Sequence, residues 1–382
     1  MFRRGISLSK IVSLIKKEAV LFIAALFALF SMFLVPLGVQ YFSYIDYPVL
    51  GILFCLMLVV AGLRKLGVFD FLSLKLLTRA KSVKHLYILL INCVFVFSMF
   101  VTNDVALIVF VPLTIGIFDF IGHKKLIFTI VMETLAANLG SMLTPIGNPQ
   151  NLYIYSFYNL DIPAFFGYVL PVGLVSYVVI MAILLLSRNE NRGVKFENKF
   201  KMGTIKLDNV KKLLLYYAAL FILCIVTVLR VLDYRICVLV VLAATLIVDR
   251  ELLKKVDYGL LLTFTCFFIF VGNLGRIDAV KDTLSLFLEG RVFIVSILSS
   301  QIISNVPVAM MISDFTRDVR NLLLGVNIGG LGTPVASLAS LISFRFYSRS
   351  KNSASGKFLA VFSVYNIAIL LLLSVIFYFA VF

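Results

Sequence analysis

The stretch NLGSMLTPIGNPQNL at residues 138–152 aligns without a gap to NIGGLGTPVASLASL at residues 327–341. The two copies are 189 residues apart and share five identical pairs: Asn138/Asn327, Gly140/Gly329, Thr144/Thr333, Pro145/Pro334 and Leu152/Leu341. Gly and Pro at this density interrupt a helix. The chain therefore carries the same helix-breaking segment twice, and this pattern predicts an internal duplication.

Two further matches lie upstream of these copies and occur in the same order in each half. Thr102-Asn103 pairs with Ser304-Asn305, and LGVFD at 66–70 pairs with LGRID at 274–278. Chance rarely gives three matches in one order. We therefore predict two structural repeats that cover most of the chain.

The composition indicates an integral membrane protein. Of the 382 residues, 62% are hydrophobic and 14% are charged, and the mean hydropathy is +1.07. The apolar residues form long unbroken blocks, which predict membrane spans in a lipid bilayer. The net charge of +16 comes from Lys and Arg in the short loops, as the positive-inside rule requires of cytoplasmic loops. This distribution excludes nucleic acid as a partner.

Two long apolar segments carry polar residues at their centres. Segment 86–121 has Thr102-Asn103-Asp104 in the middle, with Lys84 before it and Lys124 after it. Basic flanks predict that both ends are cytoplasmic, so the segment must enter the membrane and return as a re-entrant hairpin. Segment 292–318 carries Ser304-Asn305-Val306-Pro307 and predicts a second hairpin. The duplicated Gly/Pro segments predict broken helices at 126–157 and 321–344.

The loops predict an all-α fold of two inverted repeats. Residues 1–187 form the first repeat, the basic stretch 188–212 is a cytoplasmic linker, and 213–382 form the second repeat. About nine transmembrane helices, two re-entrant hairpins and two broken helices satisfy every basic loop. We expect a multi-pass protein of the cell membrane, inner or plasma, with a cytoplasmic N-terminus and an external C-terminus.

Inverted repeats with helices broken at matching positions are typical of secondary transporters. A helix broken at the midplane exposes N–H and C=O groups that lipid cannot satisfy, so the break must line a polar cavity. Half-helix N-termini favour anions there, and freed carbonyls favour cations. The alternative is that Gly and Pro only kink ordinary membrane helices.

These motifs resemble the ion transporter superfamily of arsenite permeases, citrate carriers, NhaD-type sodium/proton antiporters and divalent anion:sodium symporters. The resemblance rests on FVTNDVALIVFVPLT at 100–114, ANLGSMLTPIGNPQNL at 137–152 and ISNVP at 303–307, and it is strongest to the arsenite-permease-like branch. It implies a scaffold, a homodimer and a mobile transport domain with an elevator-type motion. The symporter branch binds sodium with two Ser-Asn-Thr tips, whereas the tips here read Thr-Asn-Asp and Ser-Asn-Val.

We predict a shared polar site made by the tips and the breaks near the midplane. Its candidate residues are Thr102, Asn103, Asp104, Asn138, Gly140, Thr144, Asn148, Ser304, Asn305, Asn327, Gly329 and Thr333. A sodium site is expected at Asn103, Asn138, Asn305 and Asn327. No Lys or Arg occurs in the two hairpins up to residue 316 or in the two broken helices. Helix dipoles and Asn, Ser and Thr side chains would therefore hold an anion.

Two acids, Asp104 and Glu133, lie inside these segments and are candidates for coupling. A carboxylate in a membrane segment is costly, which favours a functional role. Asp104 could bind Na⁺, take up a proton, or only cap the second hairpin helix.

The motifs together predict a permease, a secondary active transporter for a small anion, oxyanion or carboxylate that is coupled to an ion. A sodium/proton antiporter and an arsenite efflux permease are alternatives, and a channel or a membrane enzyme is less favoured. The sequence has no HExxH, GxSxG or P-loop motif, so no enzyme activity and no cofactor beyond Na⁺ or H⁺ is expected.

Overall fold

The structure is a computed structural model that describes residues 19–68, 82–121, 125–187, 207–350 and 353–381. Every regular element in these ranges is a helix, and none is a strand. The N-terminal basic residues, most of the basic loop after residue 68 and Lys124 lie outside the described residues. So does 188–206 of the expected linker, whereas its end is already helical because α11 begins at Leu207.

Five described helices are long and apolar enough to cross a membrane. They are α4 (Tyr47–Lys65), α6 (Val83–Val101), α10 (Ile162–Leu186), α11 (Leu207–Val228) and α19 (Ser355–Val381). A sixth candidate is α13 (Tyr258–Leu274) together with α14 (Asp278–Leu288), which are bent by 101°. Shorter apolar helices are α2 (Ala19–Leu34), α7 (Asn103–Ile121), α8 (Leu126–Ser141), α12 (Tyr234–Val248) and α15 (Val292–Ile303).

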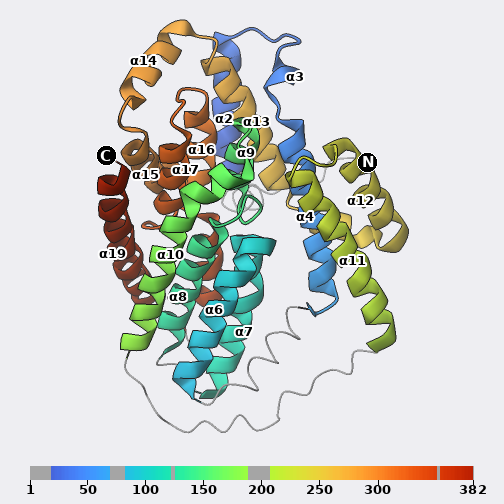
Figure 1. Ribbon diagram of the computed structural model, residues 1–382, viewed down its shortest axis with the longest axis vertical. Coiled ribbons are helices and arrows are strands. Elements are labelled where there is room, and N and C mark those ends of the chain that lie inside the picture. The colour runs from blue at the N-terminus through green and yellow to red at the C-terminus, as the bar shows by residue number, and fades with distance from the viewer. Residues whose placement is uncertain (1–18, 69–81, 122–124, 188–206, 351–352, 382) are drawn as a thin grey trace, which may run out of the picture.

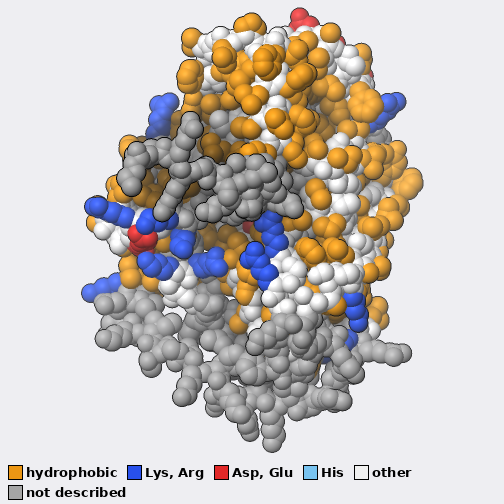
Figure 2. All heavy atoms as spheres, turned by 180° about the vertical axis from the view of Figure 1, so that it is seen from behind, with side chains coloured by type: hydrophobic (Ala, Val, Ile, Leu, Met, Phe, Trp, Pro, Cys, Tyr) orange, Lys and Arg blue, Asp and Glu red, His pale blue; other side chains and the backbone are white. Residues whose placement is uncertain are grey.

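The outer surface suits contact with lipid. Large apolar side chains such as Phe33, Leu186 and Ile247 are more than four-fifths exposed, a pattern that a water-soluble monomer rarely shows in continuous patches. Figure 2 shows apolar side chains over much of one face, whereas most of the Lys and Arg side chains in view lie in its lower half. Apolar side chains therefore cover most of the described upper part of this face and extend down beside the basic group.

The two hairpins and the two broken helices form one side of the molecule. The first half contributes α6, α7, α8, α9 (Pro149–Phe157) and α10, and the second contributes α15, α16 (Asn305–Ser313), α17 (Val319–Gly329), α18 (Leu338–Ser348) and α19. Helix α6 packs on α8 and α15 packs on α17. Contacts also cross between the halves, since α7 packs on α18 and α16 on α9. In Figure 1, α6 and α7 occupy the lower half and α15 and α16 the upper half.

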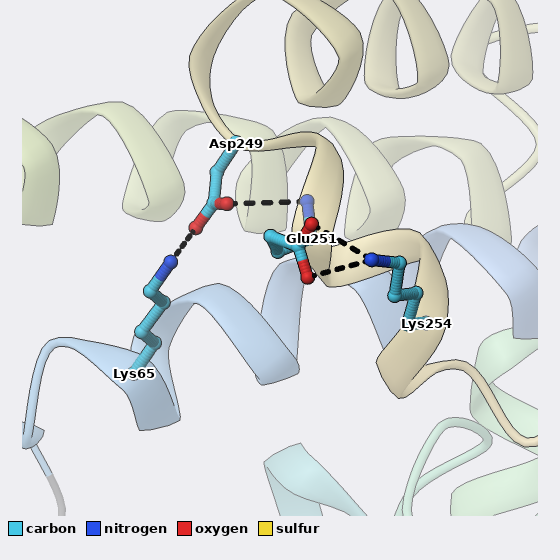
Figure 3. Close-up of polar contacts among 4 residues, drawn as sticks. All are labelled: Lys65, Asp249, Glu251 and Lys254. Atoms are coloured by element: carbon cyan, nitrogen blue, oxygen red, sulfur yellow. Dashed lines mark hydrogen bonds and ion pairs between the residues drawn. The ribbon is translucent and has the colours of Figure 1, made fainter.

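The remaining helices stand beside this group. Helix α2 packs on α13, and α4 packs on α11 and α12, with α4, α11 and α12 at the right in Figure 1. A short helix, η2 (Arg250–Lys255), follows α12, and another, α3 (Tyr41–Tyr44), precedes α4. Lys65 at the end of α4 forms an ion pair with Asp249, which caps η2 (Figure 3).

Candidate functional site

The two hairpin tips have the same unusual backbone. Thr102 has φ 73° and ψ 151°, and Ser304 has φ 74° and ψ 152°. Only glycine adopts these angles easily, so a Thr or a Ser there costs about 1–3 kcal/mol and needs surroundings that hold it. Strain of this kind gathers at functional sites. Because this strained backbone occurs at both tips, we infer that the tip conformation is needed for function although it lowers the stability of the fold.

Each tip is bonded to the break of its own half. The backbone N–H of Asn103 donates to the carbonyl of Gly147 at 3.1 Å, and that of Asn305 donates to Ala336 at 3.0 Å. Gly147 and Ala336 occupy matching positions in the alignment with the 189-residue offset. The Thr144 hydroxyl donates to the Met99 carbonyl, and its counterpart Thr333 donates to the Gln301 carbonyl. The two predicted threonines therefore anchor the tips to the breaks.

The predicted glycines act through close helix packing. A Cβ at Gly140 would lie 2.2 Å from the carbonyl oxygen of Phe95, and one at Gly329 would lie 2.9 Å from Cβ of Ser300. Both glycines therefore let a broken helix approach the first helix of its hairpin. This role places the backbone of each break and needs no direct contact with a ligand.

A buried network of amides connects the two halves. In one part, Asn103 Nδ2 donates to Asn138 Oδ1 at 3.1 Å, and Ser337 Oγ donates to the same oxygen at 3.0 Å. In the other, Asn148 Nδ2 donates to Asn327 Oδ1 at 3.1 Å, and Asn327 Nδ2 donates to Asn151 Oδ1 at 2.7 Å. Because Ser337 matches Asn148 in the repeat alignment, each broken helix pairs with the start of the opposite half-helix.

The network leaves some hydrogen-bonding capacity unused. Asn138 Nδ2 is buried and has no partner among the described residues, although an unpaired buried donor usually costs about 1–3 kcal/mol. Asn148 also caps α9, because its side chain accepts from the N–H of Asn151. Asn305 is 4% exposed, and its Nδ2 lies against Gly330, at the start of the second break. The predicted asparagines therefore lie in and around the two breaks.

A cavity of about 1270 Å³ opens beside the first tip. Thr102 and Asp104 are half-buried and line it, and α2, α4, η2, α13 and α18 supply other parts of its wall. The second tip does not line this cavity, and Ser304 is only 3% exposed. One tip therefore faces open space while the other is closed in by protein.

The two acids differ in access to the cavity. Asp104 lines it, with its Oδ1 atom buried and unpartnered among the described residues. Glu133 is completely buried, accepts a hydrogen bond from the hydroxyl of Thr114 and does not line the cavity. Asp104 is thus the predicted coupling residue that a solute in the cavity can reach.

Comparison with known proteins identifies the chain. The family model for the citrate transporter matches residues 11–320. The chain belongs to the citrate transporter family. An uncharacterised transporter of Methanocaldococcus jannaschii is 33% identical over 87% of this chain and 90% of its own. The inner membrane protein YbiR of Escherichia coli is 31% identical over 79% of this chain and 80% of its own.

A silicon efflux transporter of rice, Oryza sativa, is 32% identical over 38% of this chain and 30% of its own length. The family and these relatives identify the chain as a membrane transporter, not an enzyme. Its apolar helices make it a multi-pass membrane protein.

Sequence reasoning missed several residues at the centre of this citrate transporter family member. Ser337 and Asn151 belong to the amide network, and both lie within the repeated motifs, so the alignment itself could have indicated them. Gln301 donates to the Gly329 carbonyl at 2.8 Å and accepts from the N–H of Thr333 at 2.9 Å. Asp257 lines the cavity from the start of α13, and no sequence motif connects it with the tips.

Proposed function

We propose that the protein is a secondary active permease for a small anion, an oxyanion or a carboxylate, and that transport is coupled to an ion. The observation that carries this proposal is the amide network, in which the duplicated breaks of both halves meet as one buried polar centre. Such a centre is expensive in a membrane unless it serves a substrate or ion pathway.

The proposed topology has nine spans and two re-entrant hairpins, arranged as two inverted repeats. The spans are α2, α4, the pair α8 and α9, α10, α11, α12, α13, the pair α17 and α18, and α19. The equivalent bonds at matching positions of both halves support the duplication, and the hairpins at opposite ends of Figure 1 support the inversion. The N-terminus is then cytoplasmic and the C-terminus external.

The proposed motion is of the elevator type. The moving part is the group of hairpins and broken helices, and the scaffold is α2, α4 and α11 to α13, which would also hold a partner copy in a homodimer. The cavity supports this division because it lies between the two groups and reaches only the first tip. A shift of the moving part would expose the second tip on the other side.

The anion would be bound without an ion pair at the tips. Helix α9 begins after Asn148 and α18 begins after Ser337, so two half-helix N-termini converge on the amide network. Their partial positive charge favours an anion, and the Asn138 amide can still donate a hydrogen bond. The same side-chain oxygens could instead hold Na⁺. Asp104 on the cavity wall favours a sodium/proton antiporter as the second candidate function.

Alanine substitution at the two tips tests the proposal. We expect Asn103→Ala and Asn305→Ala each to abolish uptake into proteoliposomes, measured with labelled citrate, phosphate, arsenite and silicic acid as probes. Asn366→Ala is the matched control, because Asn366 is also buried and, within the described ranges, its side chain donates only to the Phe362 carbonyl of its own helix. Wild-type uptake by both tip variants would mean that the tips are only structural, and the proposal would fail.

A further inference from the structure

Charged side chains surround the outer part of the cavity. Arg64 and Lys65 come from the last turn of α4, Lys255 from the end of η2 and Arg345 from the last turn of α18. All four residues are exposed. Three helices that are far apart in the sequence therefore bring cations to one opening.

Some cations in this region are neutralised by acids and others are not. Lys65 pairs with Asp249 at 2.5 Å and Lys254 with Glu251 at 2.9 Å, and Figure 3 shows both pairs. Such exposed pairs contribute little to stability, but each cancels a charge at the opening. Arg64, Lys255 and Arg345 make no ion pair among the described residues.

The acids that remain on the cavity wall are fewer. Glu251 is occupied by Lys254, which leaves Asp257 at the start of α13 and Asp104 at the first tip. Asp257 accepts from the N–H of Leu260 at 2.9 Å and so caps α13. Its charge is thus partly balanced by the positive end of a helix dipole. The cavity wall therefore has three cations that make no ion pair among the described residues, against two acids, Asp257 and Asp104, of which Asp257 caps a helix.

We propose that Arg64, Lys255 and Arg345 form an anion vestibule that collects the substrate before it reaches the first tip. This inference rests on the proposed function and adds the residues that attract the anion to it, and these residues would not attract a neutral hydroxylated solute such as silicic acid. A cleft with low-dielectric walls and one excess sign of charge raises the local concentration of counter-ions about 10-fold or more. The tips carry no cation of their own, so this field has to come from the vestibule.

The positive-inside rule alone would also put Lys and Arg on this side of the membrane. The rule does not require that Arg64, Lys255 and Arg345 converge on one cavity from three helices. Nor does it require that Lys65 and Lys254 be paired with acids while these three make no ion pair among the described residues. The two explanations differ in the electrostatic potential inside the cavity, and that potential can be measured without knowing the substrate.

The test uses a cysteine on the cavity wall and thiol reagents of opposite charge. Ala61 lines the cavity from α4, and Ala61→Cys is made in a background where the partly exposed Cys93 and Cys266 are replaced by serine. The purified full-length protein is labelled with an anionic (sulfonatoethyl) or a cationic (trimethylammonioethyl) methanethiosulfonate, and rates are normalised to those with a free thiol. We expect the anionic reagent to be faster by about tenfold at low salt, and the difference to vanish near 1 M salt.

Charge variants show which residues produce the preference. Arg64→Gln, Lys255→Gln and Arg345→Gln should each lower the ratio of anionic to cationic rates by about twofold or more. Asp257→Asn keeps a capping side chain and should raise the ratio, a gain that misfolding cannot mimic. Arg235→Gln is the matched control, because Arg235 lies at the other end of α12, about 20 Å from Asp249 along the helix.

Equal rates for both reagents, or a ratio that the three glutamine variants leave unchanged, would overturn the vestibule. These outcomes are separate from those of the uptake assay. A normal charge ratio together with wild-type uptake in the tip variants would reject the proposed function and keep the vestibule. If the tip variants lose uptake but the two thiol reagents react at equal rates, the proposed function stands and the vestibule is rejected.

Discussion

Asn138 and Asn327 show how single residues connect the two halves. Each side-chain oxygen accepts from the residue that begins the opposite half-helix, Ser337 or Asn148. In a low-dielectric interior, an amide group without a hydrogen-bond partner costs much more free energy than it does in water. A change at one of these positions should therefore act on both breaks, because their partners belong to different halves.

Asp104 is the residue whose substitution tests the coupling of transport to an ion. Its carboxylate lines the cavity and has one buried oxygen without a partner among the described residues. If it carries the coupled proton, Asp104→Asn mimics the protonated form and makes uptake insensitive to pH, while exchange survives. If it binds Na⁺, the same change removes sodium dependence and the thermal stabilisation by sodium.

Asp282→Asn on the exposed side of α14 is the control and should change neither assay. Wild-type pH and sodium responses in Asp104→Asn would reduce the carboxylate to a helix cap. The search for coupling would then turn to Glu133, which only Thr114 contacts by a hydrogen bond among the described residues.

At the scale of elements, hairpin and break behave as one unit that occurs twice. The tip backbone, the bond from the tip to the break and the threonine anchor recur in both halves. One difference is Gln301, whose side chain adds two bonds to the second break, whereas its counterpart is the apolar Met99. In the first unit, Asn151 instead donates to the carbonyls of Met142 at 2.9 Å and Thr144 at 3.0 Å, so a different amide side chain holds each break.

Close packing within these units gives the prediction for elements. We expect Gly140→Ala and Gly329→Ala to destabilise the protein by about 1–3 kcal/mol, because a methyl group must push α8 off α6 or α17 off α15. Gly116→Ala in α7 is the control, since a Cβ there meets nothing within 4 Å. Thermal unfolding in detergent measures the effect. Equal midpoints for Gly140→Ala and Gly116→Ala would contradict the packing role.

At the scale of the molecule, the cavity side and the opposite side are closed differently. Away from the cavity, the Arg230 guanidinium donates to the Tyr155 carbonyl at 2.7 Å and stacks on the Tyr155 ring. Tyr158 donates to the Ser313 carbonyl at 2.8 Å. These bonds tie α9 both to the turn before α12 and to the end of α16. On the side away from the cavity, contacts of α9 therefore bridge the two halves.

The orientation in the membrane is the prediction for the whole molecule. We expect a cysteine at Lys357, in the first turn of α19, to react with an impermeant thiol reagent only from the cytoplasmic side. One at Glu289, after α14, should react only from outside, because these exposed positions lie at opposite ends of the proposed topology. Membrane vesicles prepared right-side-out from cells that express each variant expose the external side to the reagent, and inverted vesicles expose the cytoplasmic side. Reaction of both cysteines from the same side would refute the inverted arrangement.

Much of the helical pattern follows from local sequence. The breaks that separate α8 from α9 and α17 from α18 fall in the segments where Gly and Pro leave backbone groups unpaired, and the hairpin turns fall at Thr102 and Ser304. The amphipathic helix α14 and the short η2 were not predicted. A search for long apolar segments finds membrane spans, and it misses α14 because that helix is too polar and η2 because it is too short.

By itself the sequence determined the membrane class, the duplication and the residue types of the polar centre. These depend on composition, on runs along the chain and on an alignment, all of which are local or periodic properties. The tertiary structure decided which polar groups meet: Asn138 with Ser337, Asn327 with Asn148, and Arg64 with Lys255 and Arg345 at one cavity. Such meetings depend on how helices from distant segments pack, and packing is set by side-chain shape across the whole molecule, which no local pattern encodes.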